Sequence, residues 1–375
     1  MSDCLDASPT SASQRLTLSS PDAFLAAVPH LLGFPPRDSV VLVGLSEDGS
    51  GRESIRLVQR FDRPEANLDD VELTGLARAA AAPMRAAGSS SVIVAVFGEE
   101  NPTVSGVMPS MTLVDALVEE LDDAGMWVKD TLYTDGASRW SYGCDNPDCC
   151  PIAGAPISDE LRTMMAAEFA GVGAAMAPSR QSLVDDVARE AARVQEVAKH
   201  LPAVKAPTDG LEAWRDRAIA EISSLRSNPN PSPAVTAQVL TGLADVRVRD
   251  TALWELAQDP EGRDNVISAL THATRSAPNG YVAPVATALA IQQWTQGDGA
   301  RANACLDRSA GDDPSYSLAQ MVGTAIGRGL PPSSWTDVMR QLDRATCRHG
   351  NEAPNMAPRQ VSDLSVTAPS PSLAS

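Results

Sequence analysis

The chain has 375 residues, with 30 Lys and Arg against 48 Asp and Glu, which gives a formal net charge of −18. This length is enough for two or three domains with a buried core, and the 43% hydrophobic content excludes a wholly disordered chain. The acidic excess leaves no basic surface of the kind that neutralises phosphates. We therefore expect a protein that binds neither nucleic acids nor anionic membranes.

The first 143 residues alternate between strand-like and helix-like patterns. Apolar runs predict four strands, which are Ser39–Leu45, Ser54–Phe61, Ser91–Phe97 and Trp127–Tyr133. Helical spacing predicts three helices, which are Asp22–Leu32, Asp69–Ala87 and Met111–Ala124. Pro21 after Ser20, and Thr112 three residues before Asp115, are helix-start signals. Strands separated by helices predict an α/β domain with a mixed sheet.

From Ser158 onward, Ala, Leu and charged residues recur at helical spacing. Breaks that contain Pro or Gly divide this region into helices of about 12–20 residues. These features predict an all-helical domain, either a compact bundle or stacked hairpins. The stretch 294–319 resembles one tetratricopeptide-type unit, because small residues at 297–302 are followed by Asp313-Pro314-x-Tyr316. Such a domain would engage a protein partner.

The patterns divide the chain into four parts: a disordered N-terminus (1–13), the α/β domain (14–157), the helical domain (158–346) and a disordered tail (347–375). The N-terminal residues lack the cationic and apolar regions of a secretory signal. No apolar stretch reaches the length of a membrane span. Six cysteines do not form a disulfide scaffold in a chain of this size, so we expect a cytoplasmic protein.

One short segment concentrates the unusual residues of the chain. Cys144, Cys149 and Cys150 are three of the six cysteines, and they fall within seven residues. Four of the ten Trp and Tyr residues lie in or just before the same segment, at positions 127, 133, 140 and 142. The segment joins the two halves of the chain, where clefts tend to form. These residues therefore predict a local site.

Three interpretations of the cysteines remain open. Reduced thiolates at short spacing are good ligands for zinc or iron, with Asp145, Asp148 or another segment completing the coordination. Alternatively, Cys144 forms a redox pair with Cys149 or Cys150 across the Pro-flanked turn. In the third interpretation the segment is only a tight turn, and its thiols pack as small hydrophobic groups.

The residues just before the cysteines allow two interpretations. Arg139, Trp140, Ser141 and Tyr142 could form a ligand pocket, because Arg binds carboxylate or phosphate and aromatic rings provide stacking faces. Alternatively, they form a strand in which Trp140 and Tyr142 face the core while Arg139 and Ser141 face water. His30 could approach the cysteines in space, although a histidine at a helix end is the simpler interpretation.

Two motifs together resemble a known family. The first is Leu31-Leu-Gly-Phe-Pro-Pro-x-x-Ser-Val-Val-Leu-Val-Gly-Leu45, and the second is Arg139-Trp-Ser-Tyr-x-Cys-x4-Cys-Cys-Pro151. Their combination, with the segments 297–302 and 313–319, resembles the actinobacterial domain of unknown function 4192 over about residues 16–342. The resemblance implies a cytoplasmic protein, and it assigns no activity and no role to any residue.

The sequence shows no assembled catalytic set of residues. We therefore expect a non-enzymatic binding or regulatory module, with a small-ligand or metal site at the Cys-rich segment and a helical domain for protein interaction. The competing hypothesis is a thiol-based enzyme or redox sensor that uses Cys144, Cys149 or Cys150, with Arg139 lowering the thiol pKa.

Overall fold

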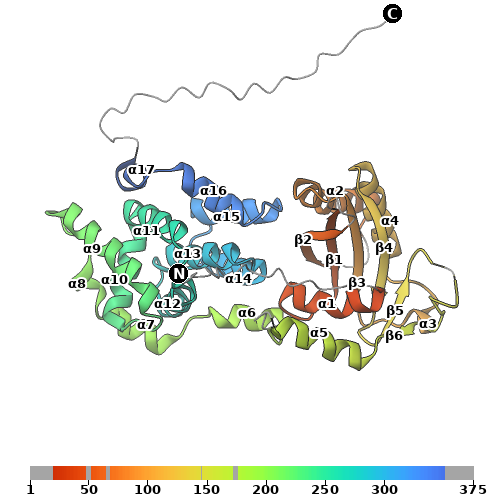
Figure 1. The fold of residues 1–375 in the computed structure, drawn as a ribbon. Coiled ribbons are helices and arrows are strands. Elements are labelled where there is room, and N and C mark those ends of the chain that lie inside the picture. Colours follow the sequence, from red (N-terminus) through yellow and green to blue (C-terminus); the bar gives the residue numbers. More distant parts are fainter. Residues whose placement is uncertain (1–19, 48–51, 65–67, 145, 172–175, 351–375) are drawn as a thin grey trace, which may run out of the picture.

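A computed structural model describes residues 20–47, 52–64, 68–144, 146–171 and 176–350. The chain forms a mixed sheet flanked by helices, followed by a long run of helices (Figure 1). The predicted fold class is therefore confirmed. The predicted disordered N-terminus and most of the predicted tail lie outside the described residues. None of the helices within the described ranges is long and apolar enough to span a membrane.

The sheet of the first domain has the strand order β2-β1-β3-β4-β5-β6. Neighbouring strands are antiparallel except for the parallel pair β3 and β4. The four predicted strands are confirmed to within two residues at each end, and β1 and β2 form the expected hairpin. The bounds of the strands are β1 (Ser39–Glu47), β2 (Glu53–Asp62), β3 (Ser91–Phe97), β4 (Trp127–Thr134), β5 (Ser138–Ser141) and β6 (Ala155–Pro156).

Helices cover both faces of this sheet because its central strands are apolar on both sides. Val40 and Leu42 of β1 pack toward α2 and α4, while Val41 and Val43 pack toward α1. Helix α5 packs in turn against α1, so it covers the α/β domain (Figure 1). The bounds of the helices around the sheet are α1 (Pro21–Leu32), α2 (Asp70–Ala86), α3 (Pro102–Ser105), α4 (Met111–Asp123) and α5 (Asp159–Gly171).

The two predicted helix starts have different outcomes. The Ser20 side chain accepts a hydrogen bond from the Ala23 amide, and Pro21 is the first residue of α1. Helix α4, in contrast, begins at Met111 after Ser110, whose φ is 56°, and its N-terminus has no side-chain cap. Thr112 therefore lies inside the helix, and the predicted cap there is wrong because the turn at Ser110 sets the start.

The helices of the second region are shorter than predicted, with 4 to 14 residues from α6 onward. The reason is that some breaks use polar caps rather than Pro or Gly. Asp245 ends α10 and also caps α11 by accepting hydrogen bonds from the amides of Arg247 and Val248. The bounds are α6 (Arg180–Asp186), α7 (Ala191–Ala198), α8 (Leu201–Val204), α9 (Leu211–Ser224), η1 (Leu225–Ser227), α10 (Pro233–Ala244), α11 (Val246–Gln258), α12 (Arg263–Ser276), α13 (Val282–Thr295), α14 (Gly299–Ala310), α15 (Ser317–Gly327), α16 (Ser333–Gln341) and α17 (Arg344–His349).

Helix α13 forms the centre of the helical domain. Most of its residues are buried on every side, and it contacts α10, α12, α14, α15 and α16. A helix that is apolar all round needs such an enclosure. The domain is therefore packed around one central helix, and the choice between a compact bundle and stacked hairpins stays a prediction. The last helix, α17, extends into the region predicted to be tail, and Cys347 in it is buried.

The two domains meet on the side of the sheet away from the cysteines. The Ala177 amide donates a hydrogen bond to the Gly33 carbonyl at 2.7 Å, beside an apolar cluster that contains Phe34 and Ala304. A second contact places Gly329 against Leu57 of β2, the edge strand opposite β6. The Cys-rich loop lies between β5 and β6 at the other edge (Figure 1). Contrary to expectation, it adjoins the domain boundary only in the sequence, because the sheet separates it from the helical domain.

Candidate functional site

The thiol loop, residues 142–154 between β5 and β6, carries the three cysteines. It is organised by Asn146. Its carbonyl oxygen accepts hydrogen bonds from the amides of Cys149 (3.3 Å) and Cys150 (2.8 Å). Its side-chain oxygen accepts one from the Asp148 amide at 3.0 Å. This is the turn chemistry that Asn supports next to Pro147. The resulting single turn brings the adjacent residues Cys149 and Cys150 back toward Cys144.

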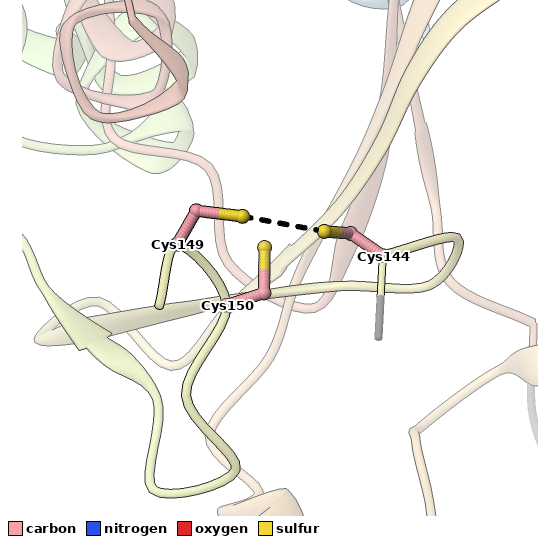
Figure 2. Close-up of side chains that lie close together, drawn as sticks. All are labelled: Cys144, Cys149 and Cys150. Carbon is pink, nitrogen blue, oxygen red and sulfur yellow. Dashed lines mark hydrogen bonds between the residues drawn. The ribbon is translucent and has the colours of Figure 1, made fainter. Parts of the chain in front are cut away.

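The three thiols converge on one point (Figure 2). Their sulfur atoms all lie within 4.8 Å of one another, and the sulfurs of Cys144 and Cys149 are 3.4 Å apart. Cys149 is exposed, whereas Cys144 and Cys150 are half-buried. The loop therefore presents a group of three thiols that is open to solvent on the Cys149 side.

Arg139 holds the inner thiol of this group. Its Nη1 atom donates to the Cys150 sulfur at 3.9 Å, and its Nη2 atom donates to the Cys149 carbonyl at 3.4 Å. Its Nε atom donates to the Asp22 carboxylate at the start of α1. The residue is only 8% exposed. The interpretation that placed Arg139 in water on a strand is therefore wrong, because α1 covers that face of β5 and supplies a carboxylate.

The surroundings raise the pKa of Cys150 to about 11. Burial is the main cause, and hydrogen bonds with the thiols of Cys144 and Cys149 add to it, while Arg139 acts in the opposite direction. Burial also raises the pKa of Asp130 on β4, and the charge of Arg139 opposes this shift. Arg139 thus lowers the thiol pKa in the predicted direction, but its effect is smaller than that of burial.

Trp140 and Tyr142 face the core on the opposite side of β5 from Arg139, as the strand interpretation predicts. The Trp140 indole packs against the Tyr133 ring and donates from Nε1 to the Ile152 carbonyl at 3.1 Å. The Tyr142 hydroxyl donates to the Pro109 carbonyl at 2.5 Å, and burial raises its pKa. Ser141 is half-buried, and its hydroxyl accepts a hydrogen bond from the Gly143 amide. The strand separates the rings from Arg139, and the predicted ligand pocket stays a prediction.

The loop closes tightly over Trp140. Gly154 has a φ of 83°, and a Cβ atom there would lie 2.6 Å from the indole ring. Its amide donates to the Pro151 carbonyl at 2.8 Å, which fixes the end of the loop. The aromatic ring and the glycine together set the path of the chain between β5 and β6.

The other candidate ligands do not join the thiols. Within the described residues, the group of possible ligands that converge here contains the three cysteines alone, so Asp148 is not part of it. Asp145 lies outside the described residues. His30 stacks on Phe169 of α5 with the ring centroids 4.9 Å apart, at the other end of α1 from Asp22. It therefore does not approach the cysteines.

Sequence reasoning missed Asp22 as part of the site. It is 117 residues from its partner Arg139, and its position in the first turn of a helix has the ordinary explanation of favouring the helix dipole. The sequence contains no signal that would have paired these two residues. Only the packing of α1 over β5 brings them together.

Comparison with protein families gives one match. A family model described as a domain of unknown function (DUF4192) matches residues 21–333, from α1 to the first residue of α16. The chain belongs to the DUF4192 family. The matched range contains the complete thiol loop, Arg139 and Asp22. Comparisons with curated proteins and with solved structures give no match.

Proposed function

We propose that this DUF4192 protein is a non-enzymatic binding or regulatory module that holds one zinc or ferrous iron ion through Cys144, Cys149 and Cys150. The observation that supports it is the convergence of three thiol sulfurs within 4.8 Å of one another on one short loop. In the reducing cytoplasm that the sequence predicts, these thiols stay available as metal ligands.

The spacing of the sulfurs is close to that of a metal site. In a tetrahedral zinc centre the Zn–S bonds are about 2.3 Å, which places the sulfurs about 3.8 Å apart. The observed separations, 3.4 Å for one pair and at most 4.8 Å overall, bracket this value. Small side-chain rotations that move the sulfur atoms by a fraction of an ångström would therefore be enough to coordinate an ion.

Arg139 and the Asn146 turn support such a site. Metal-bound thiolates are stabilised by hydrogen bonds from neighbouring groups, and Arg139 already donates to the Cys150 sulfur. Three thiolates and one divalent ion carry a net charge of −1, and the guanidinium, which also pairs with Asp22, would offset part of the negative charge around the ion. The fourth position would be filled by solvent, by an external ligand or by Asp145, which follows Cys144 in the sequence.

For the helical domain we propose a role in protein interaction. Most of its central helix is buried, so a partner would bind on the outer helices. Apolar side chains are exposed there on two consecutive helices, Met321 on α15 and Val338 on α16.

Metal analysis tests the proposed site directly. Protein purified without air and without chelator should contain about one zinc or iron ion per chain, measured by atomic emission spectroscopy. Substituting Cys144→Ser or Cys149→Ser should remove the ion. Cys347→Ser is the matched control, because this buried thiol lies in α17 of the other domain, and it should leave the metal content unchanged.

Cobalt binding and thiol labelling distinguish the proposed metal site from its alternatives. Added cobalt(II) should give thiolate charge-transfer absorption that is absent from Cys149→Ser. A wild-type protein that contains no metal, and gives no such absorption, would refute the proposal. Rapid labelling of one loop cysteine by iodoacetamide in that same protein would instead support the thiol-based enzyme.

A further inference from the structure

The thiol loop contains one pair of sulfurs that is closer than a metal site requires. Cys144 and Cys149 are 3.4 Å apart, which lies between the separation of about 3.8 Å in a zinc centre and the 2.05 Å of a disulfide. Their five-residue separation in sequence permits a bond without the constraint of adjacent residues. The same pair of sulfurs can therefore either coordinate a metal ion together or form a disulfide.

The alternative pairings are less favourable. Cys149 and Cys150 are adjacent, so their Cα atoms are only about 3.8 Å apart, below the usual range of about 4.4–6.8 Å for a disulfide. The pairing of Cys144 with Cys150 would pull the Cys150 sulfur away from Arg139, which donates to it and to the neighbouring carbonyl of Cys149. The geometry selects Cys144 and Cys149 as the pair, and leaves Cys150 as the thiol that remains in place.

We propose that hydrogen peroxide oxidises Cys144 and Cys149 to a disulfide and thereby releases the bound metal ion. This inference rests on the proposed metal site, and it identifies how that site would be regulated. The exposed Cys149 is the sulfur that the oxidant reaches first, since Cys144 and Cys150 are half-buried.

The reaction balances in two steps. The Cys149 thiolate attacks one peroxide oxygen, the O–O bond breaks, and the protein gains a sulfenic acid while hydroxide leaves as water after protonation. The Cys144 thiolate then attacks the Cys149 sulfur, the S–S bond forms, and the second hydroxide leaves as water. Two electrons pass from the two sulfurs to the peroxide, and two protons are consumed.

Metal release follows from the number of ligands that remain. After oxidation, Cys150 is the only thiolate left of the three, and one thiolate does not hold zinc in a protein site of this kind. Arg139 and the Asn146 turn keep Cys150 and the loop main chain in position. Reduction by a thiol would therefore restore the complete ligand set.

The experiment treats the zinc-loaded full-length protein with hydrogen peroxide and follows zinc release with a chromogenic chelator. About one zinc ion should appear for each disulfide formed, and dithiothreitol should restore zinc binding. Trypsin cleavage after Arg139 and Arg162 places all three cysteines in one peptide. Alkylation and tandem mass spectrometry should therefore find the label on Cys150 alone.

Variants separate failure of this switch from failure of the metal site. Metal-free Cys150→Ser should still form the Cys144–Cys149 disulfide, whereas Cys144→Ser should accumulate oxidised Cys149 without a disulfide. Cys347→Ser should behave as the wild type. If zinc binds but peroxide produces no Cys144–Cys149 disulfide, or produces it without zinc release, the switch is refuted and the metal site stands. If no metal binds, the proposed function and the release of metal both fail. Peroxide treatment of the metal-free protein then shows separately whether Cys144 and Cys149 form a disulfide.

Discussion

The cysteines of the two domains lie in opposite surroundings. Cys305 is 1% exposed among the helices around α13, and burial raises its pKa to about 12. Cys144, Cys149 and Cys150 lie instead on an edge loop, where a turn and a buried arginine bring them together. The same residue type thus fills space in one domain and forms a group of three converging thiols in the other. Local geometry distinguishes these roles, whereas the residue type does not.

The largest effect should come from the core of the helical domain. Leu289 lies in α13 and is fully buried, so Leu289→Ala should lower the free energy of unfolding by about 2–5 kcal/mol, measured by urea denaturation. Leu330→Ala, at a site that is 41% exposed, is the control and should have a small effect. Because the loop lies at the far edge of the sheet, Leu289→Ala should bind the proposed metal ion as the wild type does at low temperature. Loss of the metal would show that the two regions are not independent.

Gly154→Ala should damage the thiol loop. The positive φ costs a non-glycine residue about 1–2 kcal/mol, and the clash with the Trp140 indole adds about 1–3 kcal/mol. Gly136→Ala separates the two causes, because Gly136 also has a positive φ but has open space around its Cβ position. Only Gly154→Ala should weaken cobalt binding. Equal cobalt affinity in both variants would contradict the assigned role of Gly154.

Arg139→Met should lower stability less than Gly154→Ala does, and it should also weaken metal binding at the thiol loop. The change leaves Asp22 and the Cys149 carbonyl without their donor, which should cost about 1–3 kcal/mol. It should also weaken metal binding, because the Cys150 thiolate loses its hydrogen bond. Arg78→Met is the control, since the Arg78–Glu120 ion pair is exposed on the arginine side. Unchanged metal affinity in Arg139→Met would exclude a positioning role.

Serine substitutions compare the two kinds of cysteine directly. Cys305→Ser places a hydroxyl in an apolar core and should lower the free energy of unfolding by about 1–3 kcal/mol. Cys149→Ser on the exposed loop should change the stability of the metal-free protein by about 0.5 kcal/mol or less. Thermal denaturation of both variants in the presence of a chelator measures this difference. A reversed order would contradict the contrast between the two domains.

The smallest effect concerns Glu100, which lies three residues after the end of β3. The hydrogen bond from Arg63 lowers its pKa from 4.5 to about 2. The pKa of Glu100 is lower in the folded state than in the unfolded state. The stability that the Arg63–Glu100 pair contributes is therefore complete above about pH 4.5 and is lost as the pH falls toward 2. Glu100→Gln should therefore show a weaker loss of stability over this range than the wild type. Glu119→Gln, exposed on α4, should follow the wild-type curve in the same acid titration.

The sequence predicted the parts of the fold that depend on local pattern. The apolar run at Ser91–Phe97 is the strand β3 to the residue, and Ser20-Pro21 starts α1 as expected. Thr112 failed as a cap because the left-handed turn at Ser110 determines where α4 begins. A backbone conformation of this kind has no reliable signature in a single sequence.

The candidate site was predictable in its residues but not in its surroundings. Spacing alone identified the three cysteines, whereas the partner of Arg139 depends on how α1 crosses the sheet. Likewise, adjacency in sequence suggested a site between the domains, and the strand order places the loop at the outer edge. These failures have one cause, since long-range packing is not encoded in the local pattern.

The packing of α5 on α1 has a practical consequence for dissecting the chain. A fragment cut at the change of sequence character near Ser158 would remove α5, and expose Ala26 and Ala27 where Met165 covers them. A fragment that continues through Gly171 would keep this cover together with the whole thiol loop. Limited proteolysis should therefore produce its stable N-terminal product by cleavage after α5, rather than at the start of the helical region.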